Sequence, residues 1–200
     1  MENVVEDKPI SIYIPYALLV AALLSIFVMS INKVDLKPFE TEYPAEAFLS
    51  PQFELPSLAG GNVKLSDYRG KVVFINFWAT WCGACREEMA SMQNLYSELR
   101  SDGLEVLAVS IDRWNEDRIQ EYVKDKNLTF PVLLDQNQEV RKKYHVMGLP
   151  TSYLVDGEGK IRGFASGARD WDSQDSKEMM MSLKGIATPE SLSANRLSLR

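Results

Sequence analysis

Runs of apolar residues alternate with stretches of helical periodicity through the middle of the chain. Residues 72–78 form an apolar and β-branched run, which is typical of a buried strand. Residues 84–100 carry apolar side chains at helical spacing without an internal glycine or proline, and 104–111 is a second strand-like run. The pattern predicts a strand, a helix and another strand in succession.

The same alternation continues toward the C-terminus, and a hairpin precedes it. Gly60, Gly61 and Asn62 separate two short apolar segments within 53–65, as a hairpin turn would. Residues 156–160 are predicted to form a second turn between two strands. The remaining predictions are helices at 115–126 and 175–184, a helical turn at 139–144, and strands at 132–134, 151–155 and 161–165.

An uncharged apolar stretch, 10–31, precedes these elements and is long enough to cross a bilayer as a helix. A cleaved signal peptide is the alternative, but the run is long for that purpose and no small-residue cleavage site follows it. The predicted organisation is a flank at 1–9, a transmembrane anchor at 10–31, a proline-containing tether at 32–50, a folded domain at 51–184 and a disordered tail at 185–200.

The charge of the chain excludes one class of function. The 200 residues carry a formal net charge of −6 and no run of lysines or arginines. Such a chain repels phosphate groups, so nucleic-acid binding is not expected.

Lys33 and Lys37 follow the apolar stretch and acidic residues precede it. The positive-inside rule therefore favours a cytoplasmic location for the folded domain.

Cys82 and Cys85 are the only cysteines, and they lie where the predicted strand meets the predicted helix. The first turn of a helix offers unpaired N–H groups and the positive end of its dipole, so it stabilises a thiolate at Cys82. Residues three apart on a helix face the same side, so the two sulfurs can bond with little backbone movement. The pair is suited to dithiol–disulfide exchange.

Three other roles for the cysteines fit less well. A structural disulfide that closes so short a loop adds little stability. A zinc site needs about four ligands, and the chain adds only His145, which we expect at the surface or partly buried. Haem attachment requires a histidine after Cys85, where Arg86 stands.

Two motifs carry a family resemblance. Residues 77–88 are Phe-Trp-Ala-Thr-Trp-Cys-Gly-Ala-Cys-Arg-Glu-Glu, and residues 148–156 are Gly-Leu-Pro-Thr-Ser-Tyr-Leu-Val-Asp. Together they resemble the TlpA/ResA/DsbE-like membrane-anchored thiol:disulfide oxidoreductases of the thioredoxin superfamily, over residues 50–172. The resemblance implies an α/β thioredoxin-like fold with an added N-terminal β-hairpin, here preceded by one N-terminal transmembrane helix.

The resemblance also implies roles for the thiols and one carboxyl group. Cys82 would attack a client disulfide, and Cys85 would resolve the mixed disulfide. Glu88 lies three residues after Cys85, where its carboxylate would raise the thiol pKa and relay a proton. Many relatives have proline two residues after this glutamate, whereas this chain has Ala90, so the kink of the helix can differ.

Four further residues are expected to bind the client. Trp81 would shield one side of the sulfur pair and leave Cys82 reachable from the other. In thioredoxin-like folds the proline at the position of Pro150 follows a cis peptide bond, and the backbone of Leu149 would pair with an extended client segment. Thr151 completes this predicted site.

The remaining aromatic and methionine-rich positions are predicted to pack inside the domain. These are Trp78, Trp114, Trp171, Met179, Met180 and Leu183.

The predicted function is the reduction of disulfides in exported proteins during cytochrome c maturation or copper-protein assembly. By analogy with the relatives, the domain would lie on the extracytoplasmic side and take electrons from a membrane thiol carrier. No metal and no cofactor beyond the Cys82–Cys85 disulfide is expected. Gly83 and Ala84 offer no polar group that would stabilise a thiolate, which favours a reductant.

Two alternatives remain open. One is a thiol peroxidase on the same scaffold, although the peroxiredoxin pattern Pro-x-x-x-Thr-x-x-Cys is absent: Ile75 and Ala79 occupy the proline and threonine positions. The other is a non-catalytic module that binds copper or a client.

Overall fold

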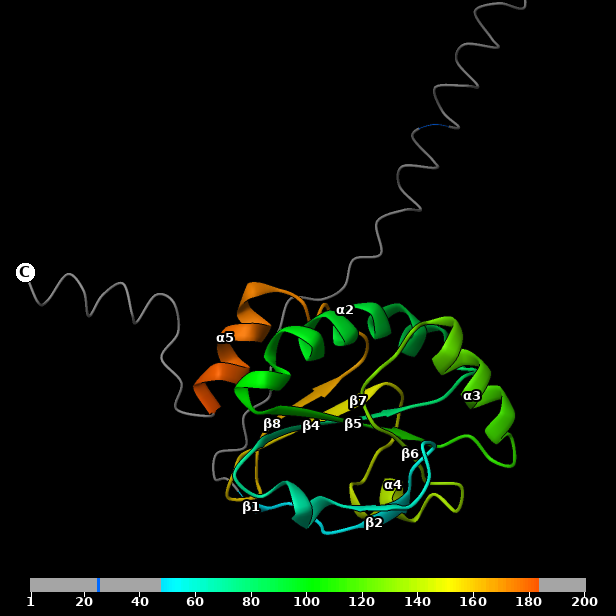
Figure 1. The fold of residues 1–200 in the computed structure, drawn as a ribbon, viewed down its shortest axis with the longest axis horizontal. Helices are drawn as coiled ribbons and strands as arrows, with labels where there is room; N and C mark the ends of the chain where they lie inside the picture. Colours follow the sequence, from blue (N-terminus) through cyan, green and yellow to red (C-terminus); the bar gives the residue numbers. More distant parts are fainter. Residues whose placement is uncertain (1–24, 26–47, 184–200) are drawn as a thin grey trace, which may run out of the picture. The chain divides into compact units, whose positions relative to one another are not determined.

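A six-stranded mixed sheet forms the centre of the domain (Figure 1). The computed structural model describes Ser25 and residues 48–183. In spatial order the strands are β1 (Phe48–Leu49), β8 (Lys160–Ser166), β7 (Thr151–Val155), β4 (Val72–Trp78), β5 (Leu104–Ser110) and β6 (Val132–Leu134). Strands β4, β5 and β6 are parallel, whereas β7, β8 and β1 join by antiparallel pairing.

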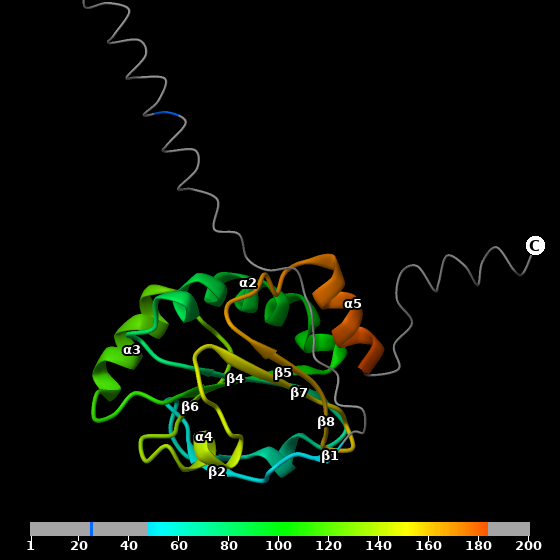
Figure 2. The same ribbon diagram turned by 180° about the vertical axis from the view of Figure 1, so that it is seen from behind.

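The helices cover both faces of this sheet. The views from opposite sides in Figures 1 and 2 place α2 (Gly83–Leu99), α3 (Glu116–Asp125) and α5 (Gln174–Leu183) on one face. The short helix α4 (Glu139–Lys143) and the hairpin of β2 (Glu54–Pro56) and β3 (Asn62–Lys64) lie on the other. Single 3-10 turns, η2 (Leu65–Tyr68) and η3 (Arg100–Asp102), lead into β4 and β5.

Strand β4 positions the reactive end of the domain. All seven of its residues are buried, because β5 and β7 flank it and helices and the hairpin cover its faces. A strand covered on both faces explains the continuous apolar run in the sequence. The strand ends at Trp78, and the chain then turns directly into α2 with the two cysteines in that turn.

The thioredoxin-like α/β arrangement and the N-terminal hairpin predicted from the sequence are confirmed. The edge strand is a difference. The sequence assigns Phe48 and Leu49 to the tether, whereas the structure pairs them with Ile161 and Lys160 of β8. This pairing joins residues more than a hundred positions apart, so no local sequence pattern predicts it.

The predicted packing role of Trp114 is wrong, because its side chain is 81% exposed. Trp78 and Trp171 are fully buried, and Met179 and Met180 are core residues of α5. His145 is exposed, as the sequence predicts.

Several predicted segments fall outside the described residues: the flank at 1–9, the anchor at 10–31 apart from Ser25, the tether up to residue 47, and the tail at 185–200. Among the residues that are described, no helix combines the length and the apolar character needed to cross a membrane.

Candidate active site

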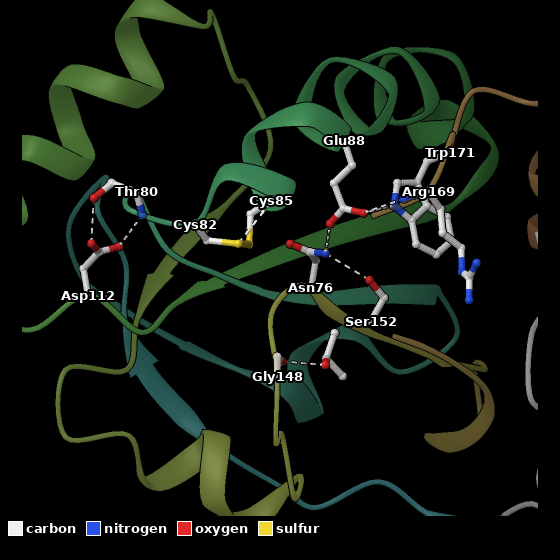
Figure 3. The surroundings of a disulfide bond; sticks show 11 residues. Asn76, Thr80, Cys82, Cys85, Glu88, Asp112, Gly148, Ser152, Arg169 and Trp171 are labelled. Atoms are coloured by element: carbon white, nitrogen blue, oxygen red, sulfur yellow. Dashed lines mark hydrogen bonds between the residues drawn. A yellow bond between two sulfur atoms is a disulfide. The ribbon is translucent and has the colours of Figure 1, made fainter. Parts of the chain in front are cut away.

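A disulfide between Cys82 and Cys85 lies at the N-terminus of α2 (Figure 3). The two Cα atoms are 5.3 Å apart. Cys82 is the N-cap residue, and its sulfur accepts a hydrogen bond from the Cys85 N–H at 3.1 Å. The same N–H would stabilise a Cys82 thiolate after reduction, together with the positive end of the helix dipole.

The two sulfurs are buried to different degrees. Cys85 is completely buried, whereas Cys82 keeps 8% of its surface exposed beside Trp81, which is 60% exposed. A client disulfide can therefore reach Cys82 first, and Cys85 is protected until the first bond has formed.

The turn before the cysteines is held by Asp112, which lies two residues after the end of β5. Asp112 accepts hydrogen bonds from the Thr80 N–H at 2.9 Å, from Thr80 Oγ1 at 2.7 Å and from Ser110 Oγ at 2.8 Å. All three residues are buried. These bonds tie the Cys82 turn to the neighbouring strand and restrict its movement.

Glu88 lies further along α2 than the disulfide, on the same helix face as Cys85, and its side chain is completely buried. Its Oε1 accepts a hydrogen bond from Asn76 Nδ2 at 2.8 Å. Its Oε2 accepts one from Trp171 Nε1 at 2.9 Å and one from the Arg169 N–H at 3.2 Å. Strand β4 and the segment between β8 and α5 thus both supply donors to one carboxyl group on α2.

Burial raises the pKa of Glu88 to about 7. The hydrogen bonds from Trp171, Asn76 and Arg169, and the positive charge of Arg169, act in the opposite direction and limit the rise. A carboxyl group with a pKa near neutral can both donate and accept a proton at physiological pH. Next to a buried thiol, it can serve as a proton store during disulfide exchange.

The sequence alone indicates Glu88 but not the residues that hold it. Arg169 and Trp171 lie in the segment between β8 and α5, more than eighty residues from Glu88. A buried indole N–H needs a hydrogen-bond acceptor, so a Trp171 predicted to be buried implies that an acceptor lies near it. The sequence does not identify Glu88 as that acceptor.

The Leu149–Pro150 peptide bond is cis. Thr151, the first residue of β7, pairs with Phe77 of β4, so the preceding loop lies at the same end of the sheet as the cysteines. Thr151 Oγ1 donates to the Gly148 carbonyl at 2.8 Å and steadies this loop. The structure thus brings all the residues of the predicted client site to one end of the sheet.

No group of three or more His, Cys, Asp or Glu side chains within the described part of the chain could hold a metal ion.

Comparisons with known proteins agree with this geometry. The model of the AhpC/TSA family matches residues 49–164. The thiol-disulfide oxidoreductase ResA of Geobacillus kaustophilus is 37% identical over 148 residues, which are 73% of this chain and 84% of that protein. ResA of Bacillus thuringiensis subsp. konkukian is 40% identical over 112 residues, or 56% of this chain, and the match spans only 64% of that relative's length.

The fold has relatives among solved structures as well. A Chlorobium tepidum protein assigned as the thiol:disulfide interchange protein DsbE superposes with a TM-score of 0.65 at 31% identity, covering 73% of this chain and all of that one. The resemblance predicted from the two sequence motifs is confirmed. The chain belongs to the AhpC/TSA family and has the ResA thiol-disulfide oxidoreductases among its relatives.

Proposed function

We propose that this protein is a membrane-tethered thiol:disulfide oxidoreductase that reduces disulfides of exported proteins. The observation that supports this most directly is the disulfide at the N-terminus of α2, with a buried carboxyl group of pKa about 7 further along the same helix face. The helix N-terminus stabilises the Cys82 thiolate, and the Glu88 carboxyl group can accept and return the proton of the Cys85 thiol.

The exchange proceeds in two steps that balance. The Cys82 thiolate attacks one sulfur of the client disulfide, forms a mixed disulfide and releases the other client sulfur as a thiolate, which takes up a proton. Cys85 then loses its proton and attacks the Cys82 sulfur, which releases the second client thiol and forms the Cys82–Cys85 disulfide. Two electrons pass from the enzyme dithiol to the client.

Glu88 is the group that can take the proton of Cys85. The thiol is fully buried, so water has little access to it, and the carboxyl group one turn along α2 is the nearest titratable side chain on that helix face. With a pKa of about 7, Glu88 is partly ionised at neutral pH and can accept this proton.

An exposed apolar surface surrounds the reactive end and suits a polypeptide client. We call Trp81, Trp114 and Met147 the apolar rim; they are 60%, 81% and 91% exposed. Trp114 lies two residues after Asp112, which is hydrogen-bonded to Thr80, the neighbour of Trp81. Met147 directly precedes the loop that contains the cis Leu149–Pro150 bond. Exposed large apolar side chains gathered at one end of a domain mark an interaction site.

Trp114 and Met147 are predicted to contribute to client binding and not to chemistry. Replacing both by alanine should raise the KM for a protein client about tenfold and leave the reduction potential unchanged, because both side chains are largely exposed whereas the two cysteines are buried. Steady-state kinetics and a redox titration measure the two quantities. Leu49→Ala is the control: Leu49 is 66% exposed but lies on the edge strand β1. Equal KM values for the double variant and the control would contradict the role of the rim.

The remaining parts of the proposal concern location and partners. The uncharged stretch 10–31 would anchor the protein, and the domain would lie on the extracytoplasmic side, where clients are apocytochrome c or a copper-binding assembly protein. A membrane thiol carrier would return electrons to the Cys82–Cys85 disulfide. The reaction needs no cofactor beyond that disulfide.

The reduction potential tests the direction of electron flow. We expect the Cys82–Cys85 couple of the full chain to have a potential near that of thioredoxin, about −270 mV, because Gly83 and Ala84 add no group that stabilises the reduced form. Equilibration with dithiothreitol and glutathione buffers, followed by thiol alkylation, measures it. A value near −120 mV would instead identify a disulfide donor.

Two further assays separate the alternatives. Rapid peroxide consumption with a thiol reductant would favour the peroxidase. A variant with both cysteines changed to serine separates catalysis from binding: if it still supports the protein's role in the cell, exchange is not the function.

A further inference from the structure

One buried polar atom beside the disulfide has no hydrogen-bond partner within the part of the chain that the structure describes. Asn76 lies in the middle of β4 and its side chain is completely buried. Its Oδ1 receives no hydrogen bond from any residue that the structure describes. An unpaired amide oxygen in a protein interior costs free energy, so a fully buried one next to a reactive site calls for a physical reason.

The orientation of the amide follows from its NH2 group. Asn76 Nδ2 donates to Glu88 Oε1 at 2.8 Å and to Ser152 Oγ at 2.9 Å. Both hydrogen bonds of the amide therefore come from its NH2 group, which faces Glu88 and Ser152, and the oxygen faces away from the carboxyl group. Figure 3 shows the amide oxygen pointing toward the Cys82–Cys85 pair.

Cys85 is the sulfur on this side of the helix. Glu88, which bonds directly to Asn76, lies one turn further along α2, and residues three apart share a helix face. In the disulfide, Cys85 Sγ has no proton and cannot donate. After reduction it carries an S–H group with no access to solvent, because Cys85 is completely buried.

We propose that Asn76 Oδ1 accepts a hydrogen bond from the Cys85 thiol in the reduced protein, so that Asn76 partners the resolving cysteine in one redox state only. An external dithiol supplies two electrons and two protons and becomes a disulfide; Cys82 and Cys85 become thiols, and the Cys85 proton meets Oδ1. The bond stabilises the dithiol relative to the disulfide and keeps Cys85 protonated. Cys82 is thereby the first nucleophile.

This inference rests on the proposed function in one respect: the Cys82–Cys85 disulfide must be reducible. Its test involves no client protein. A failure of the hydrogen bond therefore says nothing against oxidoreductase activity, and a failure of client reduction says nothing against the bond.

The first experiment reads the thiol directly. Cys82→Ala leaves Cys85 as the only thiol of the full chain, so the S–H stretching band of its Raman spectrum reports Cys85 alone. We expect the lower frequency of a hydrogen-bonded thiol, and Asn76→Ala in this background should move the band to the frequency of an unpaired thiol. Ser152→Ala is the matched control, because it removes a partner of the same amide and leaves Oδ1 in place.

The spectrum of Cys82→Ala by itself can overturn the proposal: a band at the unpaired frequency excludes the bond, whether or not Asn76→Ala folds. A band that shifts with Glu88→Gln and not with Asn76→Ala would assign the acceptor to the carboxyl group, and so would also overturn it.

The second experiment measures the thermodynamic effect in the chain with both cysteines. Asn76→Ala should shift the equilibrium with dithiothreitol toward the Cys82–Cys85 disulfide by about fivefold, because the dithiol loses a hydrogen bond that the disulfide never had. Ser152→Ala should leave this equilibrium unchanged, since its bond to Nδ2 does not involve the thiol. Equal equilibrium constants for Asn76→Ala and the unaltered chain would contradict the proposal.

Discussion

Cys82→Ser is expected to abolish disulfide exchange, whereas Cys85→Ser is expected to trap the client. Cys82 lies at the helix N-terminus and keeps 8% of its surface exposed, whereas Cys85 keeps none, and without Cys82 no mixed disulfide can form. Turnover should fall on the order of 10³-fold or more, to the uncatalysed rate. With Cys85 replaced, Cys82 still attacks, but nothing resolves the intermediate, so a covalent client–enzyme adduct accumulates.

The adduct is measured by electrophoresis without reducing agent and by mass spectrometry. Both variants should unfold at similar denaturant concentrations, since both lack the same disulfide, and this comparison controls for loss of structure. If Cys85→Ser gave no adduct while Cys82→Ser did, the assignment of nucleophile and resolving cysteine would have to be reversed. The structure argues against that outcome, because Cys85 has no exposed surface.

The parts of the site that the sequence predicts are those with local causes. A buried strand, a helix with apolar periodicity and two cysteines at their junction are all contained within 72–100, so a short window of residues is sufficient. Glu88 is also local, since its place on the helix face follows from its spacing from Cys85.

The parts that the sequence does not predict depend on long-range contacts. Trp171 reaches Glu88 across 83 positions, and Thr80 reaches Asp112 across 32. Trp114 lies just after β5 with a φ of +60°, a left-handed conformation that residues other than glycine seldom adopt. A side chain in that position projects from the turn after β5, which no hydrophobicity pattern encodes.

The pH dependence of stability is expected to reveal the buried carboxyl group. The pKa of Glu88 rises from 4.5 to about 7 on folding, chiefly because burial disfavours the ionised form. A carboxyl group with a raised pKa in the folded state binds more protons there than in the unfolded chain between these two values. The free energy of unfolding therefore falls as pH increases from about 4.5 to about 7, by roughly 3 kcal/mol in total from this group.

Glu88→Gln should remove this slope, because an amide does not titrate. Gln also changes the hydrogen bonding to Asn76, since its NH2 group would face the Nδ2 donor, but that effect is a constant offset that does not vary with pH. The quantity to follow is the difference in unfolding free energy between the variant and the unaltered chain. We expect this difference to grow in favour of the variant by about 3 kcal/mol between pH 4.5 and 8.

Urea unfolding of the oxidised proteins at several pH values gives the difference directly. Glu87→Gln is the matched control, because Glu87 is the neighbouring residue on α2 and its side chain is exposed. A parallel pH profile for Glu88→Gln and the unaltered chain would mean that the carboxyl group does not keep its proton up to neutral pH. Glu88 could not then pass a proton to and from Cys85 as proposed, and the hydrogen bonds from Asn76, Trp171 and Arg169 would have to outweigh the effect of burial.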